Sequence, residues 1–336
     1  MPTSNKSNDD PQQSLFTETC CAGEFAPHVH RDEVLAVKYP CTGRGRRNIV
    51  TCGDEGRDEF LEEVDGLDIT GVNVRGSTFP LDTFLPVIPR GMFLHSASEI
   101  PSSVVGVMLN DVLTKKVTVR HGYYYLPEDT HINTEVLKYP VFQGKHVILL
   151  SCGQDILIET LWWKRHSLGL FQTIASMGFL AVTGMNFSIF SGECPFAHAL
   201  NTKKSLRYCE WLDQLGVWAI PHIYAINRPQ RERSRDWLLA RPHIKLITIN
   251  TQLQRNRKRD VRQVFETVEF LLKNTEVNIL LHGRGRGLSS EIRSGYPHRL
   301  HFAASGPLKN AIIRKDKTPA EYIDLFVDGL ALYHRP

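Results

Sequence analysis

Four short apolar segments recur in the C-terminal half of the chain, and a polar or glycine-rich stretch follows each of them. The segments span residues 217–224, 244–250, 277–282 and 300–304, and they have the length and β-branched content of buried strands. Helical periodicity separates them, most clearly over Val261–Lys273. Strands that alternate with helices predict a parallel sheet joined by right-handed crossovers.

Similar apolar segments occur earlier in the chain, centred near residues 70, 106, 149 and 181. Residues 117–126, with three consecutive tyrosines, predict a hairpin outside this series. Eight parallel strands with intervening helices predict an α/β fold that resembles a (β/α)8 barrel, incomplete or decorated in its N-terminal part. An open doubly wound parallel sheet is the alternative. Pro319–Leu332 is expected to form a closing amphipathic helix.

Composition divides the chain into three parts. Residues 1–14 are rich in Ser, Asn, Asp, Gln and Pro, which predicts a disordered tail. Residues 15–66 form an N-terminal extension that contains cysteines, histidines and a basic turn at residues 43–47. Residues 67–336 are expected to form a single barrel-like α/β domain.

Overall composition excludes several classes of protein. Of the 336 residues, 42% are hydrophobic and 23% are charged, as in an ordinary globular domain. No apolar run approaches the roughly 18 residues of a membrane helix. The seven cysteines are spread along a long chain, which predicts a cytoplasmic protein with free thiols and no membrane partner. The net charge is only +4, so strongly basic character is local.

Arginine is concentrated directly after three of the predicted strands. Because parallel strands end at one face of the sheet, the loops that follow them bring these side chains to a single rim. The guanidinium group binds phosphate through paired donors and stacks on bases, so the rim is predicted to bind nucleic acid, either DNA or RNA. The predicted nucleic-acid-binding residues are Arg228, Arg231, Arg233, Arg235, Arg255, Arg257, Lys258 and Arg259.

A glycine-arginine turn after the strand at 277–282 predicts a phosphate site. Glycine lets backbone N–H groups approach an anion, and the N-terminus of a following helix adds a favourable dipole. Barrel enzymes commonly bind phosphate after the seventh and eighth strands, where this turn and the next one fall. A surface turn with solvated arginines is the alternative. The predicted phosphate-binding residues are Gly283, Arg284, Gly285, Arg286, Gly287, Ser305 and Gly306.

Candidate catalytic groups are few at the predicted strand ends. His282 is the best candidate for acid–base chemistry, because imidazole titrates near neutral pH, and Asp155 is the second candidate. The alternative for His282 is a hydrogen-bonded histidine that caps a strand. Hard divalent cations need carboxylates, which are scarce here, so two-metal chemistry is not expected.

No cofactor is predicted. The N-terminal cysteines and histidines contain no C-x2-C pair of the kind that structural zinc sites use, so free thiols are the primary interpretation. The alternative is a zinc site built from Cys20, Cys21, His28 and His30.

A spaced series of residues in the middle of the chain resembles a known family. The series consists of Thr183–Phe190, Cys194, Pro195, Asn201, Arg207, Trp211 and Gly216–Pro221. It resembles the domain-of-unknown-function family 4417, met in bacteria, phages and mobile elements, over about residues 147–282. The resemblance implies an α/β fold but no particular activity. Asn186 stands where relatives tend to have Asp, and Asn cannot act as a general base.

The primary functional hypothesis is a nucleic-acid-binding protein, a component of a phage- or mobile-element-related nucleoprotein system with further protein partners. A first alternative is a base- or nucleotide-modifying transferase that uses His282 and Asp155 at the same rim. A second alternative is an enzyme that acts on a phosphorylated small metabolite and engages only residues 283–287. These hypotheses leave open whether the chain is an enzyme.

Overall fold

The computed structural model describes most of the chain beyond residue 60. The described residues are 61–76, 79–115, 118–120, 123–125, 127, 129–189, 195–251, 258–283 and 288–332. The tail predicted at residues 1–14 and most of the extension predicted at residues 15–66 lie outside them.

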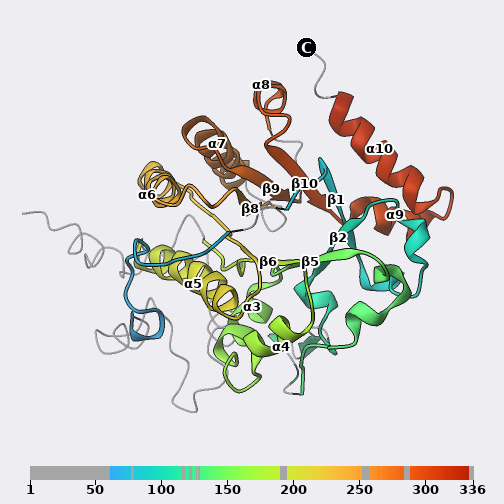
Figure 1. Ribbon diagram of the computed structural model, residues 1–336, viewed down its shortest axis with the longest axis horizontal. Helices are drawn as coiled ribbons and strands as arrows, with labels where there is room; N and C mark the ends of the chain where they lie inside the picture. The colour runs from blue at the N-terminus through green and yellow to red at the C-terminus, as the bar shows by residue number, and fades with distance from the viewer. Residues whose placement is uncertain are drawn as a thin grey trace, which may run out of the picture.

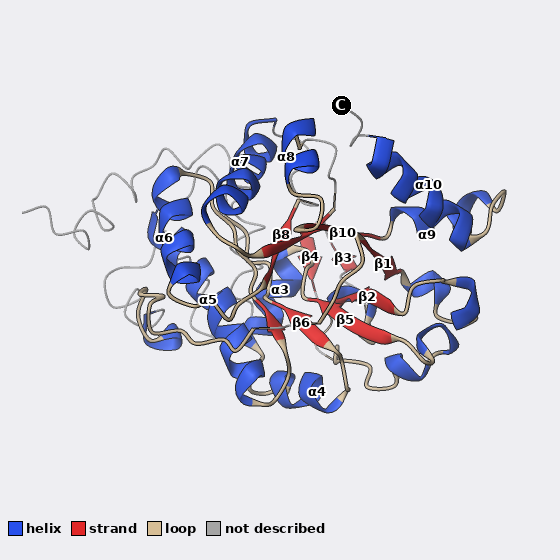
Figure 2. Ribbon diagram, turned by 45° about the horizontal axis from the view of Figure 1, so that its top comes forward, coloured by secondary structure: helices blue, strands red, loops and turns tan. Residues whose placement is uncertain are grey.

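Eight parallel strands form a nearly closed, barrel-shaped sheet surrounded by helices (Figures 1 and 2). The strands are β1 (Phe84–Ile88), β2 (Val104–Met108), β5 (His146–Leu150), β6 (Ala181–Thr183), β7 (Ala219–Ile220), β8 (Leu246–Asn250), β9 (Asn278–His282) and β10 (Leu300–Ala304). Each strand pairs with its neighbours in the order β7-β6-β5-β2-β1-β10-β9-β8. The predicted (β/α)8-barrel-like fold is therefore confirmed, rather than the open doubly wound sheet.

A short seam between β7 and β8 completes the barrel. An isolated parallel bridge joins His222, just after β7, to Thr248 of β8. The backbone N–H of Ile223 donates to the carbonyl of Thr248 at 3.0 Å, and the N–H of Thr248 donates to the carbonyl of Pro221 at 2.8 Å. The other neighbouring strands of the barrel pair in register over two or more residues, whereas β7 and β8 are joined by this short contact.

Helices cover the outside of the barrel from β5 onward (Figure 2). They are α3 (Asp155–Trp163), α4 (Leu170–Ser176), α5 (Pro195–Gln214), α6 (Arg228–Leu239), α7 (Lys258–Asn274), α8 (Ser290–Gly295), α9 (Gly306–Arg314) and α10 (Pro319–Leu332). The predicted helices at 261–273 and 319–332 are confirmed as parts of α7 and α10. None of the helices that the structure describes is long and apolar enough to cross a membrane.

The two connections before β5 differ from this pattern. Their described residues contain short 3-10 turns, namely η3 (Arg90–Met92), η4 (Ala97–Glu99), η5 (Leu109–Asp111), η6 (Val136–Lys138) and η7 (Pro140–Phe142). The predicted hairpin is confirmed as antiparallel strands β3 (Thr118–Arg120) and β4 (Tyr123–Tyr125). The barrel is thus decorated in its N-terminal part, as the sequence predicts.

The strand predicted near residue 70 is wrong. Residues 61–76 contain no strand; residues 61–64 are helical, and the rest runs along the outer helices without regular secondary structure (blue in Figure 1). We call residues 61–76 the N-terminal strap. Basic side chains bind its carbonyl groups at Val64, Asp68, Thr70, Val72 and Val74. The donors are Arg207, Lys203, Arg241 and His243. The first barrel strand is β1 instead, so the count of eight strands is unchanged.

The barrel encloses an apolar interior that is separate from the larger core between the strands and the helices. Its buried residues are Leu85, Val87, Ile148, Leu150, Ala181, Ile220, Leu246, Leu280 and Ala303. Successive side chains along a strand point to opposite faces, so residues two apart share a face. The residues that follow this interior set at spacings of two therefore line the carboxyl-terminal end of the barrel, which we call the barrel mouth.

Candidate functional site

The ends of β7, β8 and β9 bring polar side chains to the barrel mouth. His282 ends β9 and pairs in register with Asn250, which ends β8. His222 bridges to Thr248, whose register partner Leu280 belongs to the apolar interior. Paired residues of neighbouring strands point to the same face of a sheet. His222, Asn250 and His282 therefore face the inside of the barrel, above its apolar interior.

Cys152, which follows β5, also belongs to this group. It lies two residues after the interior residue Leu150, and its thiol is hydrogen-bonded to the side chain of Asn250. Burial raises the pKa of the Cys152 thiol to about 12, so the thiol stays protonated at neutral pH and is a poor nucleophile. We call Cys152, His222, Asn250 and His282 the mouth cluster.

Both histidines of the mouth cluster are neutral at physiological pH. Burial lowers the pKa of His222 from 6.5 to about 4. Burial, together with smaller electrostatic effects of His222 and Lys309, lowers the pKa of His282 from 6.5 to about 3. A neutral imidazole has one N–H donor and one nitrogen acceptor, so the cluster offers both kinds of hydrogen bond without a net charge. A pKa that low is poorly matched to proton abstraction near neutral pH, and the acid–base role of His282 stays a prediction.

His222 has an unsatisfied polar atom. No group among the described residues forms a hydrogen bond with its Nε2, although only 3% of the residue surface is exposed to solvent. Leaving a buried polar atom unpaired costs about 1–3 kcal/mol. Such atoms are rare in native proteins and call for a specific explanation, of which a bound ligand or water is one. The Nε2 atom therefore marks a point in the mouth where a ligand or a water molecule would complete a hydrogen bond.

Gly184 holds His222 in this place. A β-carbon at residue 184 would lie 2.8 Å from the backbone nitrogen of His222 and 3.0 Å from its β-carbon. The N–H of Gly184 also donates to the carbonyl of Ile220 at 2.8 Å. Only glycine lets the ends of β6 and β7 approach this closely. Sequence analysis missed His222, although its spacing of two residues from the interior residue Ile220 was a signal that could have identified it.

The predicted phosphate site lies next to the mouth cluster. β9 and β10 are the seventh and eighth strands of the barrel, as the prediction requires. Gly283 follows His282 with φ of +117°, a conformation that favours glycine, and its N–H donates to the carbonyl of Ala303 at 2.9 Å. Arg284, Gly285, Arg286 and Gly287 lie outside the described residues.

The second half of this site is the N-terminus of α9. Ser305 is the N-cap residue and Gly306 is the first residue of this nine-residue helix. Lys309 lies in the first turn of the same helix, is exposed, and has no ion pair with any residue that the structure describes. A cation at this end opposes the helix dipole, whereas an anion bound there would be favoured by both.

Asp155 follows β5, whereas His282 ends β9. Asp155 is the first residue of α3, and its carboxylate accepts a hydrogen bond from the hydroxyl of Ser188, after β6. β5 and β9 are separated by β2, β1 and β10 along the sheet. The two residues predicted as acid–base groups therefore come from well-separated strands.

The first arginine-rich stretch is not a loop, and this part of the prediction is corrected. Residues 228–235 form the first two turns of α6. The Asn227 side chain accepts a hydrogen bond from the N–H of Gln230 at 3.0 Å, and Pro229 lies in the first turn. A capping Asn and an early proline are strong signals for the start of a helix. They explain why this polar stretch is helical and not a loop.

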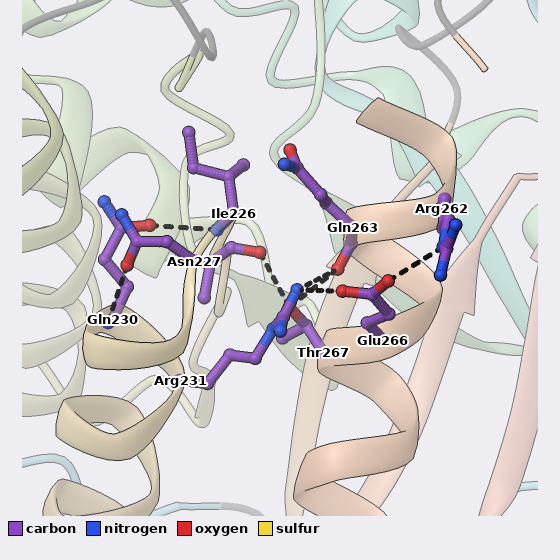
Figure 3. Close-up of polar contacts among 9 residues, drawn as sticks. Ile226, Asn227, Gln230, Arg231, Arg262, Gln263, Glu266 and Thr267 are labelled. Atoms are coloured by element: carbon purple, nitrogen blue, oxygen red, sulfur yellow. Dashed lines mark hydrogen bonds and ion pairs between the residues drawn. The ribbon is translucent and has the colours of Figure 1, made fainter. Parts of the chain in front are cut away.

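Arg231 is part of the contact between α6 and α7 (Figure 3). Its Nε donates to the hydroxyl of Thr267 at 3.1 Å, and its terminal nitrogen donates to the carboxylate of Glu266 at 2.8 Å. Only 13% of the Arg231 side chain is exposed. Arg231 therefore joins two helices, and its charge is already compensated.

The other arginines of α6 differ in their surroundings. Arg228 pairs with Glu232 at 2.8 Å, and Arg235 pairs with Asp236 at 2.7 Å. Arg233 is exposed. Lys258 and Arg259 form the start of α7, whereas Arg255 and Arg257 lie outside the described residues. Of the predicted nucleic-acid-binding residues on α6, three thus already pair with carboxylates.

The predicted zinc alternative also lies outside the described residues, at Cys20, Cys21, His28 and His30. Within the described ranges, no group of three or more His, Cys, Asp or Glu side chains is arranged to hold a metal ion.

Comparison with known proteins assigns no family to the chain: no family model matches it, and neither does any curated protein. The fold places it among barrels of the (β/α)8 type. The resemblance to family 4417 stays a prediction. Asn186, the residue that departs from that family, is buried after β6, and its N–H donates to the carbonyl of Ser151 at 3.0 Å.

Proposed function

We propose that the protein binds a phosphorylated small molecule at the barrel mouth, with the phosphate at the ends of β9 and β10. The observation that carries the proposal is the unpaired Nε2 of His222 inside a polar, buried mouth cluster. A mouth filled only by its own side chains would leave this atom unsatisfied at a cost of about 1–3 kcal/mol. A ligand that enters the mouth would remove that cost.

The location of the phosphate is argued from charge and backbone geometry. The N-terminus of α9 offers backbone N–H groups at the end of β10, beside Gly283 at the end of the neighbouring strand β9, and Lys309 adds a cation. The charge of Lys309 acts on His282, so the lysine lies close to the mouth cluster. An anion between these groups would be stabilised by the helix dipole and by the lysine together.

The mouth cluster supports binding more directly than catalysis. Its thiol is protonated and its imidazoles are neutral with low pKa values near neutral pH. The transferase hypothesis needs His282 as an acid–base group, yet its pKa of about 3 is poorly matched to that role near neutral pH. We therefore limit the proposal to recognition of the ligand.

Binding of nucleic acid is the second candidate, and it uses different residues. Arg228 and Arg233 are exposed on α6, and α7 begins with Lys258 and Arg259. We rank this candidate second because Arg228, Arg231 and Arg235 already pair with carboxylates. A role in a mobile-element nucleoprotein system with protein partners would follow only from this candidate.

The proposal is tested by 31P NMR titration of inorganic phosphate and of ribose 5-phosphate with the full chain. We expect Lys309→Ala to weaken binding of both by about ten-fold, equivalent to roughly 1.4 kcal/mol. Lys317→Ala is the matched control, because Lys317 is also exposed but follows the far end of α9. The proposal would be refuted if neither phosphate compound binds. It would also be refuted if the Lys309→Ala variant binds both compounds with the affinity of the unmodified chain.

A parallel measurement separates the second candidate. Fluorescence anisotropy with labelled single-stranded DNA, duplex DNA and RNA is recorded at several salt concentrations. Salt-sensitive binding that is lost in Arg228→Ala/Arg233→Ala but retained in Lys309→Ala would favour the nucleic-acid candidate, because phosphate contacts set the salt dependence.

A further inference from the structure

We propose that the part of the ligand inside the barrel mouth is an uncharged, hydroxyl-bearing group, so that the ligand is a phosphorylated sugar, either free or within a nucleotide. This inference rests on the proposed function, because it takes the phosphate to lie at the ends of β9 and β10. It goes further by assigning His222, Asn250 and His282 to the recognition of the sugar.

The mouth cluster offers both hydrogen-bond donors and hydrogen-bond acceptors. The carboxamide of Asn250 has both donors and an acceptor, and each neutral imidazole has one of each. A hydroxyl group also donates and accepts, so it can pair with either nitrogen of His222 whatever the tautomer. An apolar group at the same place would leave the Nε2 atom of His222 unpaired.

The four side chains of the mouth cluster also provide no charge for a charged ligand group. Moving a carboxylate or an ammonium group out of water is costly unless an opposite charge meets it. None of the four side chains of the mouth cluster is charged at neutral pH. The buried ion pair between Lys204 and Glu159, at 3.4 Å, joins α5 to α3 and so lies outside the sheet. A ligand group with a charge would find no partner in the mouth cluster.

The distance between the phosphate position and His222 sets the size of the ligand. Neighbouring strands are about 4.8 Å apart, and His222 follows β7, two strands away from His282 on β9. A ligand that reaches from the rim of β9 and β10 to His222 must therefore span roughly 10 Å. Inorganic phosphate is too small for this span, whereas a phosphorylated pentose or hexose is of suitable length.

The inference is tested by calorimetric titration of the full chain with a series of phosphate monoesters. Ribose 5-phosphate, glucose 6-phosphate and AMP carry an uncharged sugar. The comparison ligands are 3-phosphoglycerate, which adds a carboxylate, and phosphoethanolamine, which adds an ammonium group. Inorganic phosphate measures the phosphate site alone. We expect at least one sugar phosphate to bind ten-fold or more tightly than both charged comparison ligands.

A variant of the mouth cluster gives a second readout. His222→Phe keeps a ring of similar shape and removes both nitrogen atoms. We expect this variant to weaken binding of the preferred sugar phosphate about ten-fold and to leave binding of inorganic phosphate unchanged. Lys309→Ala is expected to weaken both. If His222→Phe does not fold, the ligand series on the unmodified chain still decides the question.

The outcomes distinguish failure of the inference from failure of the proposed function. Equal or tighter binding of 3-phosphoglycerate or phosphoethanolamine would overturn the sugar assignment while the phosphate site stands. Failure of every compound to bind, inorganic phosphate included, would overturn the proposed function and the inference with it. A preference for AMP over ribose 5-phosphate would identify a nucleotide as the source of the sugar, and the reverse preference would identify a free sugar phosphate.

Discussion

Arg241 links the N-terminal strap to the barrel, and its replacement should show how strongly the strap is held. Its Nε donates to the carbonyl of Val72 at 2.9 Å, and a terminal nitrogen donates to the carbonyl of Thr70. Its other terminal nitrogen donates to the carbonyl of Trp237 at 3.2 Å. The guanidinium carbon also lies 4.9 Å from the centre of the Trp237 ring. Arg241→Ala removes all of these contacts at once.

The expected loss follows from these contacts. Hydrogen bonds to a charged group contribute about 1.5–3 kcal/mol each. Burial of the guanidinium offsets part of this gain, as the desolvation that lowers the pKa of Arg241 indicates. Water can also reach some of the carbonyl groups after the side chain is removed. We therefore expect Arg241→Ala to lower the free energy of unfolding by about 3 kcal/mol. Arg241→Lys, which keeps the charge but not the planar fork, should cause about half that loss.

The measurement is urea unfolding followed by tryptophan fluorescence and circular dichroism. Arg228→Ala is the matched control, because Arg228 is an exposed helix residue that forms an ion pair with Glu232 on the helix surface. Such surface pairs contribute about 0.3–0.5 kcal/mol. If Arg241→Ala destabilises the protein no more than this control does, the strap is not held by its backbone contacts, and the reasoning is refuted.

Three further predictions use the same unfolding measurement. Gly184→Ala should lower the free energy of unfolding by about 3 kcal/mol, because the new methyl group would lie 2.8 Å from a backbone nitrogen; a loss below about 1 kcal/mol would contradict this. Arg231→Ala should cost about 2 kcal/mol, because the partly buried hydrogen bonds of its guanidinium to Thr267 and Glu266 are lost even though both residues keep other partners, and a neutral result would show that the contact between α6 and α7 does not need Arg231. Stability should also depend on pH. The folded pKa values of His222 and His282 lie below the ordinary 6.5, so the unfolded chain binds more protons below that pH. The contribution of the two neutral histidines to the free energy of unfolding is present above about pH 6.5 and is lost as the pH falls toward 4. Between pH 7 and pH 5 we expect the free energy of unfolding to fall by about 2–4 kcal/mol. An unchanged free energy of unfolding would show that the histidines are not buried as described.

The barrel could be predicted because its strands are short, continuous apolar segments, which is typical of buried parallel strands. The error at the first strand has a specific cause. Ile69, Val72 and Val74 are all buried, as strand residues are, but their neighbours are helices and basic side chains rather than another strand. β1 was missed because it contains Pro86, which is unusual within a sheet strand. Apolar pattern reports burial, and it does not report what the backbone bonds to.

The site was less predictable than the fold, because its properties depend on contacts between distant residues. The charge of Arg231 is compensated by Glu266, which is 35 residues away in sequence. Nothing in the arginine-rich stretch itself indicates this partner. His282 was identified from its place at a strand end, yet its low pKa comes from burial that only the closed barrel produces. His222 could have been found from its spacing, but its unpaired nitrogen could not.

Hydrogen exchange at the seam between β7 and β8 should depend on whether a ligand occupies the barrel mouth. Two backbone hydrogen bonds hold this part of the barrel, and the same short stretch contains His222. A pairing this short can open locally without unfolding the remaining strands. A molecule bound to His222 would oppose that opening and slow the exchange of the amide hydrogens of Ile223 and Thr248 with solvent. Exchange rates at these two amides would therefore reveal a ligand in the mouth before its chemical identity is known.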